Sequence, residues 1–363
     1  MVENRNFSIF SHGFVFVNFA IGYGFQDMFI DWKALFPLAA KKYVYFISEE
    51  STMRYIGCKT QLLENIKEVV FKHAKDAKSF CDIFSGTASV GRYFKQWFEV
   101  YSNDLLYFSY CLQKGTIECD KKPTFSRVKM ELGIQSPLDF FNNMDSSSME
   151  KLEQEKRFFQ NNYSPKGGRM YLTDSNALRI DFARNKIEEW EKNKLLSKDE
   201  YFYLIAALVE GIPFVSNIAG TYGAFHKFWD ARTAKRFCLI DLPVFTNKKN
   251  NLSFNEDGTQ LLKKISGDIL YIDPPYNERQ YLPNYHLLET AAKYDNPFLR
   301  GVTGQRAYEN QKSEFCSRKT VVAAFEDLIK IANFKHIILS YNTDGIMTLD
   351  EIAEVMKKHG IKK

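Results

Sequence analysis

One stretch of the sequence combines residue types that could act on an amino group: Asp273-Pro-Pro-Tyr276, directly after the predicted hydrophobic strand 269–272. Two consecutive prolines fix the backbone and carry no N–H, so their carbonyls remain free to accept hydrogen bonds. Asp273 adds carboxylate acceptors, and Tyr276 adds a flat ring face. This set suits a planar ring with an amino group, which would donate to Asp273 and to the Pro274 carbonyl while the ring stacks on Tyr276. We therefore predict a catalytic turn made of Asp273, Pro274, Pro275 and Tyr276.

The chemistry that such a turn supports is attack by the amine on an electrophilic methyl group. An aromatic amine is a weak nucleophile because its lone pair is delocalised into the ring. Acceptors for both N–H groups favour a pyramidal nitrogen and free the lone pair for in-line attack on a sulfonium methyl. Such catalysis rests on positioning and preorganised acceptors, without a covalent intermediate or a metal. By itself the tetrapeptide is also compatible with a proline-rich turn capped by Asp273.

The composition is that of a globular protein without a metal centre. Of the 363 residues, 45% are hydrophobic and 26% are charged, which excludes wholesale disorder. The six cysteines form no CxxC pair, and the six histidines form no HxH or HxxxH pair. We therefore predict buried free thiols in a reducing compartment and no metal site. The net charge of +5 is compatible with a polyanionic partner but does not require one.

Alternating strand and helix patterns place the catalytic turn at the end of a strand. The patterns predict strands at 79–84, 99–103, 251–254, 269–272 and 336–340, and helices at 61–73, 90–98, 259–265 and 321–333. Helical patterns alone dominate the middle of the chain, at 149–161, 180–192 and 199–209. In an open α/β sheet, ligands bind beyond the carboxyl ends of the strands. We predict a Rossmann-like α/β domain from residues 53–106 and 249–363, interrupted by a mostly helical insertion at 107–248.

Residues 1–52 differ from the rest of the chain. No Asp, Glu, Lys or Arg occurs between Phe7 and Gln26, a length that would just span a bilayer. Several polar residues make this stretch a poor membrane helix, and it has no clear cleavage site of a signal peptide. We expect either an accessory segment packed on the core or translated sequence upstream of a true start at Met53, and we favour the second.

The longer run 273–289 resembles the N6-adenine-specific DNA methyltransferases of the D12 class, in the group with the motif order cofactor loop, recognition insertion, catalytic turn. The resemblance covers about Met53 to the C-terminus. It implies S-adenosylmethionine as methyl donor and a flipped-out adenine in double-stranded DNA as substrate. It also implies a cytoplasmic bacterial or phage enzyme that protects host DNA alongside a restriction endonuclease, with no metal and no membrane partner. The family usually continues with a terminal strand pair, which is missing here, so we expect an exposed sheet edge.

The resemblance also implies a cofactor site. Arg54-Tyr-Ile-Gly-Cys-Lys59 resembles the opening motif, which helps to hold the methionine part of the cofactor. Asp82-Ile-Phe-Ser-Gly-Thr87 resembles the cofactor loop, where Gly86 lets the backbone approach the ligand. An acid at Asp104 implies contact with ribose hydroxyls, and one at Asp257 implies contact with the cofactor adenine. The implied cofactor residues are Tyr55, Lys59, Asp82, Phe84, Gly86, Thr87, Asp104 and Asp257.

The insertion is the expected DNA-binding part. Segment 217–229 resembles a family segment near DNA, and basic residues follow it. Basic and aromatic residues interleaved in this way suit phosphate contacts and base stacking, although any one of them could equally lie on a solvated helix face or in a small core. Arg279, just past the catalytic turn, could bind a phosphate or Glu289. The expected DNA-binding residues are Tyr222, Lys227, Arg232, Lys235, Arg236 and Arg279.

Several other functions stay open or are disfavoured. The catalytic turn alone does not separate N6 of adenine in DNA from N4 of cytosine or from adenine in RNA. A DNA-binding relative that has lost catalysis is a further alternative, against which the intact Asp273 and Tyr276 argue. A nucleotide hydrolase would need a phosphate loop with a lysine, a dehydrogenase a GxGxxG loop, and a C5-cytosine methyltransferase a Pro-Cys nucleophile, and the sequence has none of them.

Overall fold

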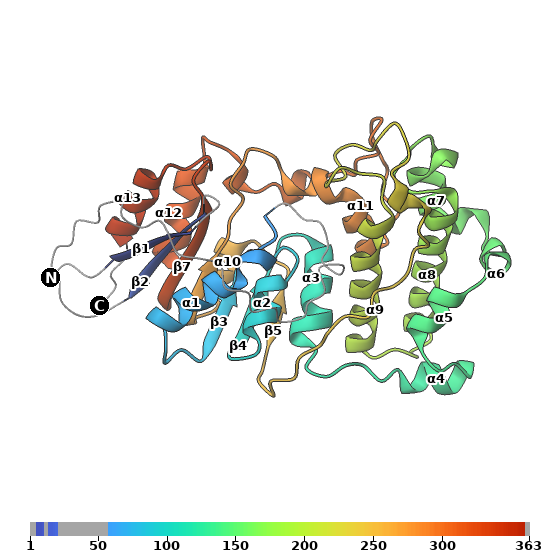
Figure 1. The fold of residues 1–363 in the computed structure, drawn as a ribbon, viewed down its shortest axis with the longest axis horizontal. Coiled ribbons are helices and arrows are strands. Elements are labelled where there is room, and N and C mark those ends of the chain that lie inside the picture. Colours follow the sequence, from blue (N-terminus) through green and yellow to red (C-terminus); the bar gives the residue numbers. More distant parts are fainter. Residues whose placement is uncertain (1–4, 11–13, 21–56, 360–363) are drawn as a thin grey trace.

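The computed structural model describes residues 5–10, 14–20 and 57–359. A sheet with helices on both faces forms one part of the molecule, and a bundle of helices forms the other (Figure 1). No helix among the described residues is long and apolar enough to cross a membrane. The predicted opening residue Tyr55 and the expected start at Met53 lie outside the described residues.

The sheet has seven strands in the order β1-β2-β7-β6-β3-β4-β5. Its strands are β1 (Arg5–Phe10), β2 (Phe14–Ala20), β3 (Ser79–Asp82), β4 (Glu99–Asn103), β5 (Leu252–Phe254), β6 (Gly267–Ile272) and β7 (Phe334–Asn342). The strands from β7 to β5 in this order pair in parallel, whereas β1 and β2 pair antiparallel. This parallel sheet with crossover helices confirms the predicted Rossmann-like α/β class.

The edge that we expected to be exposed is covered. Strand β2 pairs antiparallel with β7, from Phe14 opposite Asn342 to Ala20 opposite His336. The β2 sequence is uncharged and rich in aromatic and β-branched residues, as suits a strand inside a sheet. Paired backbone groups on β7 are not open to another chain. The N-terminal segment that we expected to lie upstream of the true start therefore contributes two strands to the sheet.

Helices cover both faces of the sheet. They are α1 (Leu63–His73), α2 (Ser89–Phe94), α10 (Gly258–Leu262), α12 (Val321–Ile331) and α13 (Leu349–His359). Successive residues of β6 point to opposite faces: Ile269 and Tyr271 join one buried cluster, and Leu270 and Ile272 join the other. Both faces of the strand are covered, which is the reason that residues 269–272 form a continuous apolar run.

The helical part is built from the middle of the chain. Its helices are α3 (Tyr107–Gln113), α4 (Ser126–Leu132), α5 (Pro137–Asn143), α6 (Ser146–Glu150), α7 (Phe158–Tyr163), α8 (Asp174–Lys192) and α9 (Lys198–Gly211). Side chains cap the first turns of the two long helices, Thr173 on α8 and Ser197 on α9, where Ser197 forms a capping box with Glu200.

One predicted helix, 149–161, is wrong, because the chain breaks it into α6, a 3-10 turn and α7. Arg157 donates to the carbonyls of Glu150 and Leu152, and so ends α6. Asp181, buried in α8, accepts from the first-turn amides of Phe159 and Gln160, and so starts α7. Hydrogen bonds with side chains outside the two helices determine where α6 ends and where α7 begins, so the local sequence pattern could not predict these boundaries.

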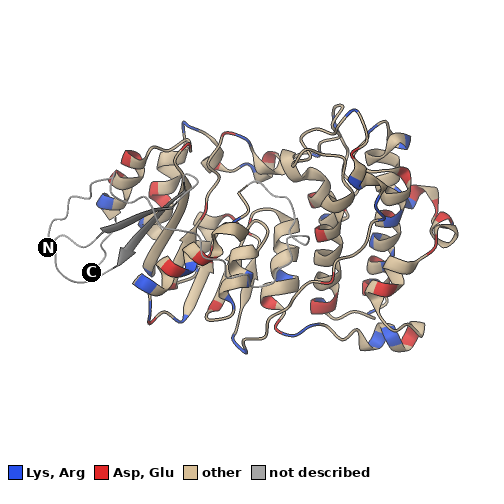
Figure 2. Cartoon of the chain, in the orientation of Figure 1, with Lys and Arg blue, Asp and Glu red and all other residues tan. Residues whose placement is uncertain are grey.

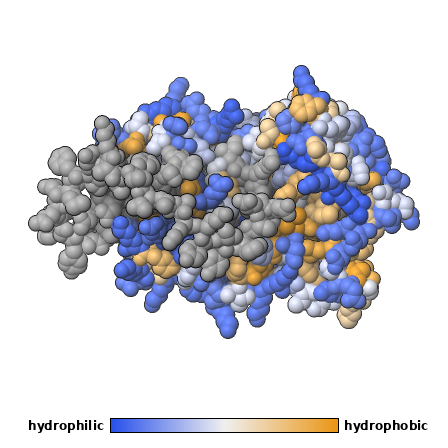
Figure 3. Space-filling model, viewed as in Figure 1, coloured by the Kyte–Doolittle hydropathy of each residue, from blue (hydrophilic) through white to orange (hydrophobic). Residues whose placement is uncertain are grey.

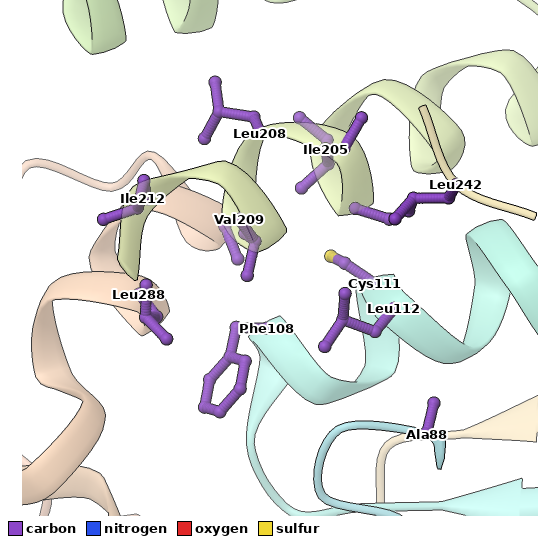
Figure 4. Packing of buried hydrophobic residues seen from close by; sticks show 14 of the residues in the cluster. Ala88, Phe108, Cys111, Leu112, Ile205, Leu208, Val209, Ile212, Leu242 and Leu288 are labelled. Atoms are coloured by element: carbon purple, nitrogen blue, oxygen red, sulfur yellow. The ribbon is translucent and has the colours of Figure 1, made fainter. Parts of the chain in front are cut away.

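A helix that follows the catalytic turn, α11 (Tyr281–Lys293), packs on the helical part. Figure 4 shows Leu288 of α11 facing Phe108 of α3 and Val209 of α9, all of them fully buried. The turn 273–276 therefore lies where the sheet and the helical part meet.

Candidate active site

A cavity of about 580 Å³ lies at the carboxyl ends of the parallel strands. Its wall is formed by the loops after β3, β4 and β5, by the turn after β6 and by the start of α11. All these strands run the same way, so their carboxyl ends meet at one edge of the sheet. The volume lies within the range of about 300–1,000 Å³ that small-molecule sites occupy.

Asp273 lies in this cavity with its two oxygens in different environments. Its Oδ2 is 2.7 Å from Nζ of Lys59, whose side chain is only 2% exposed. The same Nζ donates to the Gly57 carbonyl at 3.0 Å. Oδ1 is buried and has no hydrogen-bond partner among the described residues. Burial raises the pKa of Asp273, and the charge of Lys59 opposes that rise. One oxygen is thus held in place while the other remains able to accept a hydrogen bond.

The Tyr276 ring lies beside this ion pair, with Nζ of Lys59 5.7 Å from the ring centre. It lies against Gly57, where an added Cβ would come within 2.8 Å of the Tyr276 hydroxyl oxygen. Gly57 has a φ of +78°, which favours glycine, so backbone conformation and close approach both require a glycine there. Burial raises the pKa of Tyr276 to about 12, and the Asp273 charge adds to this rise. The ring is therefore a neutral flat surface near neutral pH.

Asp82 is a second buried acid in the cavity wall. It is 1% exposed, and neither carboxylate oxygen has a hydrogen-bond partner among the described residues. Burial raises its pKa to about 8, and the nearby Asp273 charge adds to the rise. Burying an ionised carboxylate without a hydrogen-bond or ion-pair partner costs free energy, unless a ligand supplies that partner. A cationic group in the cavity would be that partner, and the α-ammonium of S-adenosylmethionine fits this requirement.

The loop after β3 is hydrogen-bonded to Asp104, the acid that follows β4. Asp104 accepts from the backbone amides of Gly86 at 2.8 Å and Leu106 at 2.9 Å. Burial raises the pKa of Asp104 to about 6, although both backbone hydrogen bonds act against the rise. Each oxygen keeps a further lone pair, so the carboxylate can still accept from a pair of hydroxyl groups. Phe84 and Thr87 line the cavity next to this loop.

Asp257 also lines the cavity, but its side chain already has a structural partner. Its Oδ1 accepts from the backbone amide of Gln260 at 3.0 Å and so caps α10. Sequence reasoning missed another pair in the wall, Gln280 and Ser313. The Gln280 amide donates to the Ser313 carbonyl at 3.0 Å and accepts from its N–H at 2.8 Å. Gln280 lies within the run 273–289, whereas no motif pointed to Ser313.

The structure places the expected DNA-binding residues in different surroundings. Lys227, Lys235, Arg236 and Arg279 are exposed. Arg232 is paired with Asp230 at 2.8 Å, and Arg236 donates to the Met144 carbonyl at 2.7 Å. Glu289 is fully buried and paired with Lys293, so of the two partners expected for Arg279, Glu289 is excluded.

The prediction that Tyr222 binds DNA is wrong, because only 1% of the residue is exposed. Its hydroxyl lies 3.1 Å from that of Ser216, and its carbonyl accepts from Tyr171 at 2.6 Å. A ring buried in this way cannot stack on a base, so Tyr222 positions its loop from within. The pattern of alternating basic and aromatic residues does not distinguish a buried ring from an exposed one.

The described residues contain no group of three or more His, Cys, Asp or Glu side chains that could hold a metal ion. All described cysteines are free thiols. Four of them are buried, whereas Cys58 and Cys238 are partly exposed, so the prediction of buried thiols holds for four.

Residues 55–355 match the model of the D12 class N6 adenine-specific DNA methyltransferases. The chain is 48% identical over 313 residues to the Type II methyltransferase M.FokI of Planomicrobium okeanokoites, which covers 85% of this chain and 47% of that protein. It is 43% identical over 310 residues to the modification methylase StsI of Streptococcus sanguinis, with 85% and 47% covered. It is 38% identical over 315 residues to the Type II methyltransferase M.NlaIII of Neisseria lactamica, with 85% and 89% covered. The chain thus spans about half the length of the first two relatives.

Proposed function

The chain belongs to the D12 class N6 adenine-specific DNA methyltransferases, and on that premise we propose that it transfers a methyl group from S-adenosylmethionine to N6 of an adenine in duplex DNA. The observation that carries the proposal is the environment of Asp273. Lys59 holds one carboxylate oxygen at 2.7 Å, and the other is buried without a partner among the described residues. An acceptor left open beside a flat aromatic ring suits an amino group on a planar base.

The turn acts on the amine by orienting it. Asp273 Oδ1 accepts from one N–H of the base, and the Pro274 carbonyl accepts from the other. Tyr276 stacks on the ring and sets its plane. With both N–H groups engaged, the nitrogen lone pair points out of the ring plane and toward the cavity. The residues lower the barrier through position and fixed dipoles.

We propose that the same cavity holds the methyl donor. Asp82 would bind the α-ammonium group, and Asp104 would bind the ribose hydroxyls. When bound, S-adenosylmethionine supplies an electrophilic methyl group on a sulfonium centre. Phe84, Gly86 and Thr87 line the same wall, and the positive φ of Gly86 keeps the backbone of that loop close to the cavity.

Adenine in a duplex must leave the base stack before it can reach this turn. Unpairing costs a few kcal/mol, which stacking on Tyr276 and phosphate contacts would offset. We also propose that the protein works beside a restriction endonuclease in the cytoplasm of a bacterium or phage host. Relatives such as StsI, a modification methylase, support this partner.

The test is transfer of labelled methyl from S-adenosylmethionine to unmethylated genomic DNA, with total RNA as a parallel substrate and nucleoside mass spectrometry as readout. We expect label in N6-methyldeoxyadenosine. Asp273→Ala should reduce turnover about 100-fold or more while affinity for S-adenosylhomocysteine changes less than about 3-fold, since Asp273 contacts the base. Label in N4-methyldeoxycytidine or in RNA, or full activity of Asp273→Ala, would contradict the proposal.

A further inference from the structure

A short hairpin follows α11, and none of its residues lines the cavity. Arg300 and Gln305 pair across it, with backbone N–H to carbonyl distances of 2.8 and 2.9 Å. Gly301 and Gly304, with φ values of +67° and +64°, occupy turn positions that favour glycine. The turn is therefore encoded in the local sequence. We call residues 298–305 the Val302 hairpin.

Side chains of the helical part hold the hairpin backbone firmly. Arg169 donates Nε to the Val302 carbonyl at 3.0 Å and Nη2 to the Gly301 carbonyl at 3.0 Å. Its remaining Nη1 donates to the carbonyl of Asn162 in α7 at 2.8 Å. At the base of the hairpin, Arg306 is 7% exposed and contacts Asp295 at 2.5 Å. Such anchoring fixes where the tip points.

The hairpin presents apolar side chains to solvent, at its base and at its tip. Phe298 is 81% exposed and Val302 is 80% exposed, and both rank among the large hydrophobic residues most open to solvent in the described chain. The upper right edge of the space-filling view carries hydrophobic residues among hydrophilic ones (Figure 3). Exposed apolar side chains that gather on one surface among polar residues are typical of a site that binds a partner.

The hairpin is joined to segment 217–229, which also exposes aromatic rings. The Tyr171 hydroxyl donates to the Tyr222 carbonyl at 2.6 Å and lies 3.0 Å from the Thr303 carbonyl. The two loops therefore lie side by side, as the olive and orange loops above α11 show (Figure 1). Phe228 on the second loop is 69% exposed and Trp229 is 41% exposed.

The net charge of these two loops is positive once the ion pairs within them are discounted. Segments 217–236 and 294–306 contain the acids Asp230 and Asp295, and each is paired with an arginine, Arg232 or Arg306. Figure 2 shows Lys and Arg along the same loops. The basic residues outside these two pairs are Lys227, Lys235, Arg236 and Arg300, all exposed. Apolar side chains interleaved with unneutralised cations match a nucleic acid, which presents bases between phosphates.

The hairpin lies at a fixed distance from the catalytic turn. Helix α11 starts at the cavity wall with Tyr281 and ends at Lys293, just before the hairpin. Its 13 residues, with a kink at Tyr285, span at most about 20 Å at about 1.5 Å per residue. With a rise of about 3.4 Å per base pair, this is the length of about six base pairs. The hairpin is therefore close enough to the cavity for a duplex to reach both.

We propose that the Val302 hairpin binds duplex DNA within about six base pairs of the target adenine. Phe298 and Val302 contact base edges, such as a thymine methyl group, and Arg300 contacts a phosphate. The hairpin then helps to determine which sequence is methylated. This inference rests on the proposed function, and it adds a recognition element that lies outside the insertion 107–248.

The test uses the double variant Phe298→Ala with Val302→Ala, whose side chains are too exposed to support the fold. The control is Met130→Ala, which is equally open at 81% but lies on α4, at the opposite side of the helical part (Figure 1). Affinity for an unmethylated duplex carrying the mapped site is measured by anisotropy with S-adenosylhomocysteine bound. We expect about 10-fold or more weaker binding for the double variant and no change for Met130→Ala. Affinity for S-adenosylhomocysteine should be the same in all three proteins.

A second variant checks the phosphate contact. Arg300→Gln should lower the slope of log affinity against log salt by about one unit. An unchanged duplex affinity and methylation pattern in the double variant would overturn the inference, as would a loss of S-adenosylhomocysteine binding in parallel, which would indicate a structural role. Failure of the proposed function itself would look different, because the unsubstituted protein would then place no label on DNA.

Discussion

Nζ of Lys59 lies 2.7 Å from Oδ2 of Asp273, although Lys59 precedes the first helix of the sheet domain and Asp273 directly follows β6. The pair is largely buried, with exposures of 2% and 15%. It couples the segment expected to hold the cofactor to the turn expected to hold the base. A cation at this distance favours the ionised acceptor form of a carboxylate whose burial disfavours it.

Replacing Lys59 by Met should therefore change the pH dependence of turnover. Burial already raises the pKa of Asp273, and Lys59 counteracts that rise. Without the cation the pKa rises further, so the acceptor form is populated only at higher pH. We expect activity at pH 7 to fall about 100-fold, and the rising limb of the kcat profile to move to higher pH. Lys59→Arg keeps the charge and should keep most of the profile in place. An unchanged rising limb in Lys59→Met would refute this role.

Cofactor binding should depend on the protonation of Asp82. Its pKa is raised to about 8, so in the free protein at pH 7 the acid is mostly neutral. A cationic ligand favours the ionised form, so binding releases a proton, and affinity should increase with pH up to about 8. Below that value, affinity for S-adenosylhomocysteine should fall by about tenfold per pH unit.

Calorimetry in two buffers of different ionisation enthalpy, at pH 6 to 8, measures the released proton directly. Asp82→Asn should bind more weakly at pH 8 and lose the dependence on pH. Binding that is independent of pH in the unsubstituted protein would show that Asp82 does not contact the cation.

The Tyr276 ring, rather than its hydroxyl, should matter for turnover. Because its pKa is raised to about 12, the hydroxyl stays protonated and takes no part in proton transfer near neutral pH. Tyr276→Phe should retain activity within about 3-fold, because the stacking face is kept. Tyr276→Ala should lose about 1–3 kcal/mol of stacking, or roughly 5- to 150-fold in kcat/KM. A loss in Tyr276→Phe as large as in Tyr276→Ala would instead assign the role to the hydroxyl.

Glu289 should be a strong stabiliser of the junction between α11 and α3. It is fully buried, and it accepts from the amides of Tyr107 and Phe108 at 3.1 and 3.0 Å and from Gln311 at 2.9 Å. Glu289→Gln removes the charge that these donors face, so the free energy of unfolding should fall by about 2–3 kcal/mol.

Denaturant unfolding of Glu289→Gln measures this cost. Glu189→Gln is a matched control, because Glu189 is 52% exposed and paired with Lys186 at 2.8 Å on the surface of α8. The control should change the free energy of unfolding by less than about 0.5 kcal/mol. Equal effects of the two substitutions would mean that burial does not strengthen the Glu289 contacts.

The sequence by itself determined the features that depend on neighbouring residues. A strand of alternating or continuous apolar residues followed by Asp273-Pro-Pro-Tyr276 is a local pattern, and so is the glycine loop after β3. Because parallel strands end at one edge, these local patterns were enough to predict that Asp82, Asp104 and Asp273 lie around one site. The α/β class and the helices α8 and α9 follow from periodicity in the same way.

Only the tertiary structure decided which distant groups meet. The pairing of Lys59 with Asp273, the addition of β2 to β7 and the packing of α11 on the helical part join segments far apart in the chain, and no local propensity encodes them. Burial of Tyr222 and the break between α6 and α7 depend on partners such as Ser216 and Asp181. Free energies of hydrogen bonding and burial at these places are set by the surrounding packing, which exists only once the chain has folded.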